Sequence, residues 1–578
     1  MGKAFGNRTD VADILFTTNN TTLNGTTLPG LGFNYVRYNA GACGPGSVNG
    51  QSMVINSIPA SRQIQGYWLN PTSSNPGSSS WNWSVDANQR AMLLNAKARG
   101  ANRFELFSNS PMWWMLQNYN PAGAANASTD NLSSSYTQHF AIYLATIAKY
   151  AQDNWGITFT TVEAFNEPLS SWWKASGGQE GCYIGTAAHP GIISGLRTEL
   201  NSRGLNSMAI SAADCYSFDQ TVSAWNGYSA TTRSQVGQIN SHGYQKLGGN
   251  QAGVYGVAAA AGKKLYNSEY GDNDASGMTM ASVINHNLAV LHPTGWTYWQ
   301  PLDGSGWGLI DANVSAGTIG AIRPRYYVMA QYSRHIRPGM TIINSGDANS
   351  VAAYDATANK LVIVTSSVTA QTITYNLANY ATVSGPITRW VTVTGSGDKY
   401  VRRTDLSLSG KTFSATFAAN SVQTFEIQNV STTASTIANG TYKIINRNSG
   451  LALDVADNGT ANGANVDQAT YTAGNNQRWT VTNLGGGQYS IIGVGSGKSL
   501  DVTGGSTANG ANIAIWTYSG STNQIWTFAA TSGGYFTITS VRSGKVLDVV
   551  GRSTASGANV DQWTSNGGTN QQWILQAP

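Results

Sequence analysis

Two glutamates about a hundred positions apart give this chain its clearest chemical signal. Glu167 ends the segment TVEAFNE and Glu269 ends KKLYNSE, and each follows a short β-branched and aromatic run and precedes loop residues. A β/α barrel places its catalytic groups in this way, at the carboxyl ends of its strands. Because the chain has only seven glutamates, two at strand ends predict a general acid paired with a nucleophile.

The segments around these glutamates alternate between strand-like runs and amphipathic helical patterns, which predicts parallel strands joined by crossover helices. One such helix is expected from Ser84, as its N-cap, to Gly100. An open seven-stranded sheet would leave two unpaired edges in a fold that normally closes. We therefore expect a (β/α)8 TIM barrel whose first strand is missing from this chain, with a genuine seven-stranded sheet as the alternative. The seven predicted strands cover 32–39, 103–109, 158–167, 207–214, 236–244, 264–270 and 295–301.

The pattern changes twice after the barrel. From Pro338 onward strands alternate with turn residues and no helix interrupts them, which predicts an antiparallel β-sandwich packed on the barrel. A short Ser/Thr stretch then indicates a linker. The predicted multidomain organisation is a catalytic barrel at 1–337, a β-sandwich at 338–430, a linker at 431–438 and a repeat domain at 439–578.

The last domain repeats with a period of 47 residues. The sequence LDV recurs with Asp454, Asp501 and Asp548, and a Q-x-W sequence follows each of them at a constant distance. Two independent landmarks that repeat three times without slippage predict three structural units stacked about a pseudo-threefold axis.

This repeat domain resembles the ricin-type β-trefoil of carbohydrate-binding module family 13. The resemblance implies that each Q-x-W tryptophan is core, while an Asp, an aromatic residue and an Asn of each repeat face a galactose-containing glycan. In the first repeat Ala469 stands at the aromatic position, so that site lacks its stacking surface unless Tyr471 compensates. Carried onto this chain, the sugar-binding residues are Asp548, Trp563, Asn570, Asp501, Trp516, Asn523, Asp454 and Asn476.

Residues 1–428 resemble glycoside hydrolase family 30 through the segments NYVRYN, FELFSNSPMWWM, AFNEP, NSEYGD and GWTYWQPLDGSGWGL. The resemblance implies a retaining enzyme with Glu167 as acid/base and Glu269 as nucleophile, whose carboxyl groups lie roughly 5 to 5.5 Å apart. It also implies that Asn166 bonds the sugar, Tyr244 supports the nucleophile and Trp299 forms the floor of the site. We expect Glu163, four residues deeper than Glu167, to pair with an arginine such as Arg37 or Arg103. Glu180 and Glu199, in loop and helix contexts, are expected in solvent. The expected substrate-binding residues are Arg37, Asn109, Asn166, His242, Tyr244 and Trp299.

The sequence leaves the substrate open between several polysaccharides. FELFSNSPMWWM is most similar to the endo-β-1,6-galactanase branch of the family, and an endo-β-1,6-glucanase or a xylanase are the alternatives. A different class stays open, a carbohydrate-binding protein whose barrel is inactive because of the missing strand. Two carboxylates suffice for the chemistry, so no cofactor or metal is expected.

Composition limits the partners and the compartment. Charged residues make up 11% of the chain and the net charge is +5, without a basic cluster, so nucleic acid and membrane are not expected partners and a monomer is expected. Eighteen Trp and 27 Tyr favour a polysaccharide partner. The composition is typical of an extracellular protein, although no signal peptide opens the chain, which we attribute to a truncated start; a cytosolic glycosidase is the alternative. A Cys182–Cys215 disulfide with Cys43 free is expected, and three buried thiols are the alternative.

Overall fold

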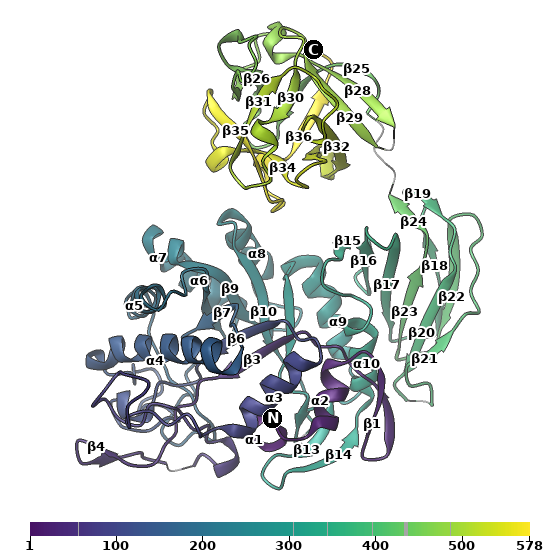
Figure 1. The fold of residues 1–578 in the computed structure, drawn as a ribbon. Helices are drawn as coiled ribbons and strands as arrows, with labels where there is room; N and C mark the ends of the chain where they lie inside the picture. Colours follow the sequence, from purple (N-terminus) through teal and green to yellow (C-terminus); the bar gives the residue numbers. More distant parts are fainter. Residues whose placement is uncertain (56, 305, 344, 396, 433–436, 486) are drawn as a thin grey trace. The chain divides into compact units, whose positions relative to one another are not determined.

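The computed structural model describes residues 1–55, 57–304, 306–343, 345–395, 397–432, 437–485 and 487–578. It divides into two compact units (Figure 1). The first comprises Met1–Leu377 with Val383–Val430, and the second Ala378–Thr382 with Ser431–Pro578. Half of the predicted linker, residues 433–436, lies outside the described residues, and its first two positions belong to a short strand, β24 (Val430–Thr432).

The first unit is built on a sheet of seven strands in the order β11-β10-β9-β8-β7-β6-β3. Every neighbouring pair in it is parallel, as the alternating pattern predicts, and all seven predicted strands are present. β3 and β11 are its two edges, and both line a cavity of about 910 Å³. The strands are β3 (Tyr35–Asn39), β6 (Arg103–Phe107), β7 (Thr161–Glu163), β8 (Ala209–Cys215), β9 (Val236–His242), β10 (Lys264–Tyr270) and β11 (Gly295–Tyr298).

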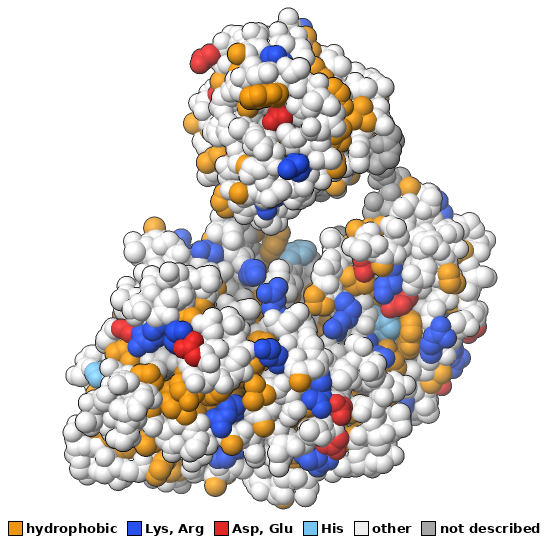
Figure 2. Space-filling model, in the orientation of Figure 1, with side chains coloured by type: hydrophobic (Ala, Val, Ile, Leu, Met, Phe, Trp, Pro, Cys, Tyr) orange, Lys and Arg blue, Asp and Glu red, His pale blue; other side chains and the backbone are white. Residues whose placement is uncertain are grey.

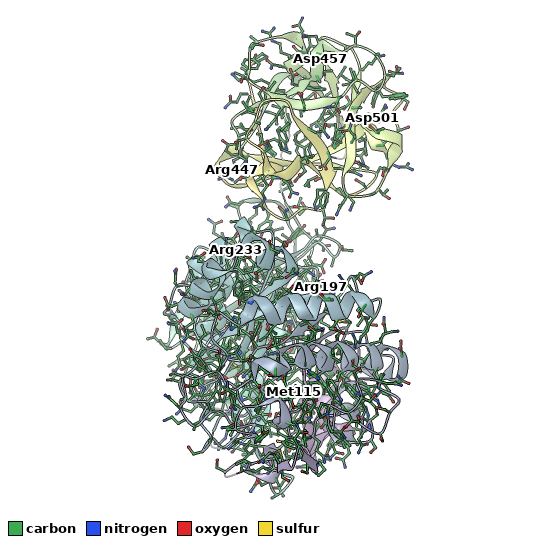
Figure 3. All side chains as sticks on the ribbon, turned by 90° about the vertical axis from the view of Figure 1, so that its left-hand side faces the viewer. Met115, Arg197, Arg233, Arg447, Asp457 and Asp501 are labelled. Carbon is green, nitrogen blue, oxygen red and sulfur yellow. The ribbon has the colours of Figure 1, made fainter. Side chains whose placement is uncertain are left out.

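Amphipathic helices cover the outside of this sheet (Figure 1). In α4 (Thr137–Tyr150) the apolar positions Phe140, Leu144 and Ile147 recur at helical spacing and are buried. Arg197 and Arg233 belong to two helices of this layer (Figure 3). The other helices are α1 (Gly2–Phe5), α2 (Thr9–Phe16), α3 (Ala87–Ala98), α5 (His189–Ser202), α6 (Phe218–Gly227), α7 (Ala230–Gln235), α8 (Gln251–Ala260), α9 (Met278–His286) and α10 (Pro324–Ser333).

Helix α3 corrects one predicted boundary. It begins at Ala87, three residues after the predicted N-cap, because Ser84 donates its hydroxyl to Asn82 and caps no helical N–H. Asp86 occupies the N-cap position in a left-handed conformation. The predicted stop holds, since Gly100 has a φ of 100° that favours glycine.

The β-sandwich packs on the barrel through α9 and α10. Gln331 of α10 donates to Thr392 at 2.8 Å and accepts from Thr424 at 2.6 Å, so the two layers share buried hydrogen bonds as well as one core. The main sheet has the order β15-β16-β17-β23-β20-β21, and a short pair, β18-β22, accompanies it. A separate pair, β19-β24, falls mostly within the residues of the second unit. The bounds are β15 (Thr341–Ile343), β16 (Ser350–Asp355), β17 (Lys360–Ser367), β18 (Gln371–Asn376), β19 (Tyr380–Val383), β20 (Ile387–Val393), β21 (Val401–Arg403), β22 (Thr412–Phe417) and β23 (Ser421–Ile427).

The second unit is a β-trefoil of twelve strands. Trp479, Trp526 and Trp573 are fully buried in one core, as predicted for the Q-x-W tryptophans. Three asparagines, one from each repeat, form a closed ring in which each amide donates to the next at 2.8–2.9 Å: Asn465, Asn559 and Asn512. The strands are β25 (Gly440–Asn446), β26 (Ala452–Val455), β27 (Val466–Ala469), β28 (Trp479–Gly485), β29 (Gln488–Gly493), β30 (Ser499–Val502), β31 (Ala511–Trp516), β32 (Ile525–Ala530), β33 (Phe536–Ser540), β34 (Val546–Val549), β35 (Ala558–Trp563) and β36 (Trp573–Gln576).

Short accessory strands join the elements of the first unit. β12 pairs with β13 and β13 pairs with β14 beyond the last barrel strand, while β1 and β2 form a hairpin near the start. Their bounds are β1 (Asn20–Leu23), β2 (Thr26–Pro29), β4 (Ser47–Val48), β5 (Gln51–Ser52), β12 (Leu302–Asp303), β13 (Ile310–Asn313) and β14 (Thr318–Ile322).

The cysteines decide one further expectation. Cys43, Cys182 and Cys215 are all buried and free, so the expected Cys182–Cys215 disulfide is wrong and the alternative of three buried thiols holds. On the face in Figure 2, Lys and Arg side chains stand in small groups and form no continuous patch. Within the described ranges, no helix is both long and apolar enough to cross a membrane.

Candidate active site

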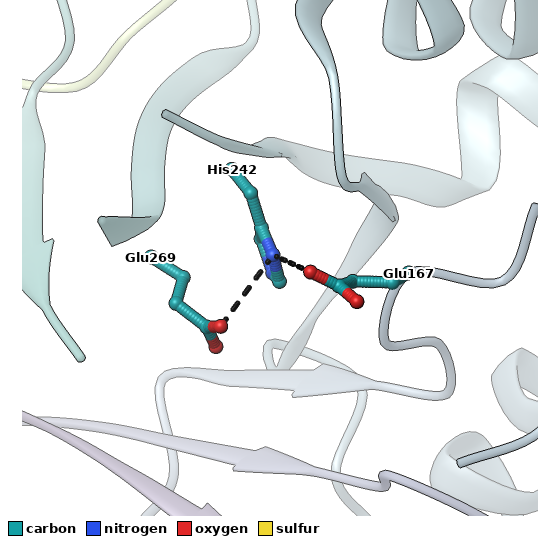
Figure 4. Close-up of side chains that lie close together, drawn as sticks. All are labelled: Glu167, His242 and Glu269. Atoms are coloured by element: carbon teal, nitrogen blue, oxygen red, sulfur yellow. Dashed lines mark hydrogen bonds and ion pairs between the residues drawn. The ribbon is translucent and has the colours of Figure 1, made fainter. Parts of the chain in front are cut away.

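Two carboxylates meet at the carboxyl ends of the barrel strands (Figure 4). Glu269 lies within β10, and Glu167 lies four residues beyond β7 with a left-handed φ of 48°. Its backbone N–H donates to the carbonyl of Asp214 at 2.8 Å, which fixes the turn. One oxygen of each carboxylate lies within 4.8 Å of the other. Such a distance is typical of retaining pairs and is shorter than the roughly 6.5 to 9.5 Å of inverting pairs.

His242, at the end of β9, lies between the two glutamates (Figure 4). Its Nδ1 is 3.0 Å from Glu167 Oε1 and 3.6 Å from Glu269 Oε1, and its Nε2 is 3.3 Å from Asp214 Oδ1. Burial alone would lower the pKa of His242, but Glu269 and Asp214 outweigh burial and raise it to about 10. The imidazole is therefore cationic at neutral pH and donates to Glu167.

Arg37 of β3 is the second cation of the site. Its guanidinium contacts Glu105 at 2.9 Å, Asp214 at 2.5 Å and Glu269 at 3.1 Å, and the arginine side chain is 7% exposed. Burial would raise the pKa of Asp214, but Arg37 and His242 hold it well below its ordinary value. Two cations thus compensate the buried carboxylates around the barrel mouth.

Both oxygens of Glu269 accept a hydrogen bond. Tyr244 donates its hydroxyl to Oε1 at 2.7 Å, and Arg37 donates Nη1 to Oε2 at 3.1 Å. Burial raises the pKa of Glu269 above its ordinary value, while His242 and Arg37 act in the opposite direction. These donors favour the ionised carboxylate, which is the form a nucleophile needs.

Glu167 is also held through both oxygens. His242 occupies Oε1, and the indole N–H of Trp172 donates to Oε2 at 3.0 Å. The neighbouring Trp173 donates its indole N–H to the backbone carbonyl of Glu167 at 2.8 Å. One carboxylate oxygen of Glu167 therefore contacts the buried His242, and the other contacts the indole ring of Trp172.

A cavity of about 610 Å³ opens beside the two carboxylates. Four of the predicted substrate-binding residues line it: Asn109, Asn166, Tyr244 and Trp299. The other two contact the carboxylates directly: Arg37 bonds Glu269 and His242 bonds Glu167. The Oδ1 of Asn166 is buried without a hydrogen-bond partner in the described structure, so it is available to a ligand hydroxyl. Further lining residues are Arg62, Gln179, Asp303, Trp307 and Asn313.

The trefoil brings its predicted residues together within each repeat. The Asn amide donates to the Asp carboxylate at 2.5 Å for Asn476 and Asp454, 2.9 Å for Asn523 and Asp501, and 2.7 Å for Asn570 and Asp548. Trp516 is 44% exposed and Trp563 is 43% exposed, so two repeats present an open indole face, whereas the first has Ala469 there. Asp501 is labelled on this unit in Figure 3.

The three trefoil repeats differ in a second carboxylate that the sequence patterns did not reveal. Asp467 lies opposite Asp454 across a strand pair, and Asp561 lies opposite Asp548, but Ala514 takes this position in the second repeat. Burial, together with Asp548, raises the pKa of Asp561 to about 7. Its Oδ1 is buried and has no hydrogen-bond partner in the described part of the chain.

Comparisons with known proteins agree with these two sites. Residues 2–255 match the family described as O-Glycosyl hydrolase family 30, and residues 417–516 and 522–578 match the ricin-type beta-trefoil lectin domain-like family. A protein named endo-beta-1,6-galactanase, from Hypocrea rufa, is 52% identical over 433 residues, which are 74% of this chain and 90% of that protein. The chain belongs to glycoside hydrolase family 30.

Solved structures support the same fold for the family 30 unit. A conserved exported protein from Bacteroides fragilis matches with a TM-score of 0.58 at 16% identity, over 73% of this chain and 95% of that one. The catalytic domain of GH30 xylanase C from Talaromyces cellulolyticus matches with a TM-score of 0.53 at 20% identity, over 74% and 94%. At these identities the likeness shows the shared fold of a barrel with an associated β-rich domain.

The structure corrects two expectations about other glutamates of this family 30 barrel. Glu163 pairs with neither Arg37 nor Arg103; it is fully buried and accepts from the Phe165 N–H at 3.2 Å. Arg37 pairs with Glu105 in its place, because Glu105 lies directly opposite on the neighbouring strand. Glu180, expected in solvent, is 1% exposed and accepts from the Asn39 amide at 2.9 Å.

The sequence interpretation missed one residue of the site, Asp214, and left Trp172 open between sugar binding and loop packing. Asp214 ends a strand as Glu269 does, so its position near the end of 207–214 was the available signal. Trp172 follows AFNEP in a loop, and an indole there was equally compatible with loop packing. Trp113, Trp114 and Trp173 are buried, which separates them from Trp172, whose side chain is 43% exposed.

Glu167, His242 and Glu269 are also the one group, within the described residues, whose spacing could hold a metal ion. His242 has a pKa raised to about 10, with burial opposing and Glu269 and Asp214 producing the rise. A protonated imidazole has no lone pair to donate to a metal. The group therefore fits acid–base chemistry better than metal binding at neutral pH.

Proposed function

We propose that the barrel hydrolyses glycosidic bonds with retention, with Glu167 as acid/base and Glu269 as nucleophile. The observation that carries the proposal is the pair of carboxylates at the strand ends, with oxygens within 4.8 Å and a cationic His242 between them. This separation leaves room for direct attack by one carboxylate and not for an intervening water.

In the first step a Glu269 oxygen attacks the anomeric carbon while Glu167 gives its proton to the departing glycosidic oxygen. In the second step water attacks the glycosyl-enzyme, Glu167 takes a proton from that water, and the Glu269 ester bond breaks. Tyr244 and Arg37 hold the Glu269 carboxylate in both steps. Asn166 and Asn109 would hydrogen-bond the sugar in the cavity, and Trp299 would stack beneath it.

For the substrate, we propose internal β-1,6 linkages of galactan, such as the side chains of arabinogalactan. The support is the 52% identity to the Hypocrea rufa protein named endo-beta-1,6-galactanase over 90% of that protein's length. Endo-β-1,6-glucanase and xylanase activities remain the alternatives within the family, because a few hydroxyl contacts decide between these sugars.

Reducing-sugar release from de-arabinosylated arabinogalactan tests the activity, with β-1,6-glucan and xylan in parallel and Glu269→Gln as control. We expect release from galactan by the parent chain and none by the variant. Proton NMR of the first product should show the β-anomer before mutarotation. Equal inertness of both proteins, with galactan still retarding them in a gel, would favour the alternative of a carbohydrate-binding protein.

We further propose that the trefoil binds galactose-containing glycans and that the protein works outside the cell. Exposed Trp516 and Trp563, each beside an Asp–Asn pair, support binding in the second and third repeats. The low charged fraction of 11% and a polymeric substrate support an extracellular setting. Affinity electrophoresis in galactan tests the first point: Trp516→Ala with Trp563→Ala should abolish retardation, and Ala469→Trp should strengthen it.

A further inference from the structure

Trp172 combines two properties that a packing residue does not have. Its ring is 43% exposed, yet its indole N–H is committed to Glu167 Oε2 at 3.0 Å. The adjacent Trp173, by contrast, is 3% exposed and bonds only the backbone carbonyl of Glu167. The loop after β7 thus supplies one indole that fixes the backbone of Glu167 and another that reaches its carboxyl group.

Trp172 contacts Glu167 but is not among the residues that line the 610 Å³ cavity. Glu269, Asn166 and Trp299 line that cavity, so it accommodates the sugar that Glu269 attacks. The acid/base carboxyl marks the boundary between this sugar and the leaving group, because it must reach the oxygen that joins them. Trp172 contacts this carboxyl group and is outside the cavity, so its exposed ring is adjacent to the expected position of the leaving-group sugar.

A second aromatic residue, Tyr216, packs against the ring of Trp172. Tyr216 meets Trp172 edge to face at a centroid distance of 4.6 Å, and Tyr216 in turn stacks on Tyr244 at 5.2 Å. Tyr244 is the residue that donates to Glu269. The aromatic row thus links the partner of the acid/base to the partner of the nucleophile, and it leaves a face of Trp172 open to solvent.

Resting on the proposed roles of Glu167 and Glu269, we propose that Trp172 is a positioning residue for Glu167 and the platform of the leaving-group sugar. We place the catalytic proton on Oε2, since Oε1 faces the buried cation His242. As that proton passes to the glycosidic oxygen, Oε2 becomes negative and the hydrogen bond from Trp172 strengthens. The indole N–H thereby stabilises the charge that develops in the transition state.

Two substitutions separate the two roles. Trp172→Phe keeps a ring and removes the N–H, so it should lower kcat on β-1,6-galactan by on the order of tenfold. On the 4-nitrophenyl glycoside of β-1,6-galactobiose, whose leaving group departs without a proton, kcat/KM should change less than about threefold, because kcat/KM reports only the step in which that group leaves. Trp172→Ala should in addition raise KM for galactan by roughly tenfold relative to Trp172→Phe, because the stacking surface is lost.

The pH profile supplies a readout that a merely structural role would not move. Without the indole N–H the ionised form of Glu167 is less stabilised, so the basic limb of kcat/KM should shift to higher pH in Trp172→Phe. Tyr255→Ala is the matched control, because Tyr255 is 42% exposed on the outer helix α8 and packs on His292. It should leave both substrates and the pH profile unchanged.

An unchanged pH profile in Trp172→Phe, or an equal loss on both substrates, would overturn the proposal. Equal KM values for Trp172→Ala and Trp172→Phe would overturn the platform role. Failure of the proposed function itself would look different: the unsubstituted chain would then release no sugar from galactan, or Glu269→Gln would be as active as the parent.

Discussion

The barrel and the trefoil both bury carboxylates, but they leave them in different charge states. In the barrel, Arg37 and His242 contact Asp214, and they hold its pKa below the ordinary value although burial acts in the opposite direction. In the trefoil, burial and Asp548 raise the pKa of Asp561 to about 7, and Arg552 opposes the raised pKa of Asp548 without reversing it. The comparison shows that the partner, more than the burial, decides whether a carboxylate is ionised at neutral pH.

This difference matches the work proposed for each region. Hydrolysis with retention needs an ionised nucleophile beside a group that gains and loses a proton, and the two cations provide the charge for that. A sugar-binding site needs hydrogen-bond donors and acceptors in place, and a carboxyl group that keeps its proton near neutral pH supplies both.

Replacing Glu269, the proposed nucleophile, should have the largest effect on activity. Glu269→Gln keeps the shape of the side chain but cannot attack, so kcat on galactan should fall by at least roughly three orders of magnitude. Binding of galactan to the trefoil should not change, since the two regions do separate work. Reducing-sugar assays and affinity electrophoresis on the same preparations measure both; residual turnover within tenfold of the parent would contradict the assignment.

Removing the central cation should mainly affect stability. Arg37→Met leaves Glu105, Asp214 and Glu269 without their shared partner, so the first unit should lose about 3 to 5 kcal/mol of unfolding free energy. Chemical denaturation followed by near-ultraviolet circular dichroism measures the loss. Arg103→Met is the matched control, an exposed arginine on the neighbouring strand, and it should cost little. Similar losses in both variants would refute the special role of Arg37.

Removing the phenol that supports Glu269 should change the pH dependence. Tyr244 donates to the ionised carboxylate, so Tyr244→Phe should raise the pKa of Glu269 further. The nucleophile must be ionised, and therefore the acid limb of kcat/KM should move to higher pH, by roughly one unit or less. A limb that stays in place, or moves to lower pH, would show that another group controls it. Tyr255→Phe on α8 serves as the control.

The smallest effect concerns the trefoil alone. The pKa of Asp561 is raised by burial first and by Asp548 next, to about 7, so the second unit should lose stability as pH rises from about 4 through 7. Asp561→Asn should remove part of this loss and raise the melting temperature at pH 8 more than at pH 5. Ala514→Asp should introduce the same pH dependence into the second repeat. Calorimetry at the two pH values measures the melting temperatures. Identical changes in melting temperature at both would contradict the raised pKa of Asp561.

Much of this could be predicted from the sequence because it is local. Strand ends follow from β-branched runs, which placed Glu167, Glu269 and Arg37, and a period of 47 residues placed Asp501 and Asp548 in equivalent positions. These inferences need only the residue type and its place in an element.

What could not be predicted depends on three-dimensional partners. Arg37 pairs with Glu105 and not Glu163 because of the register between β3 and β6. Asp561 meets Asp548 only through the pairing of β34 with β35. The free state of Cys182 and Cys215 likewise reflects distances that spacing in the sequence does not fix.

Trapping the covalent intermediate would show directly whether Glu269 attacks the sugar. A 2-deoxy-2-fluoro-β-1,6-galactobiosyl fluoride forms the glycosyl-enzyme and slows its hydrolysis, since fluorine destabilises both transition states. Peptide mass spectrometry of the inactivated protein should find one disaccharide on Glu269, and Glu167→Gln should still be labelled. Labelling of a different residue, or turnover with inversion and no adduct, would contradict the account.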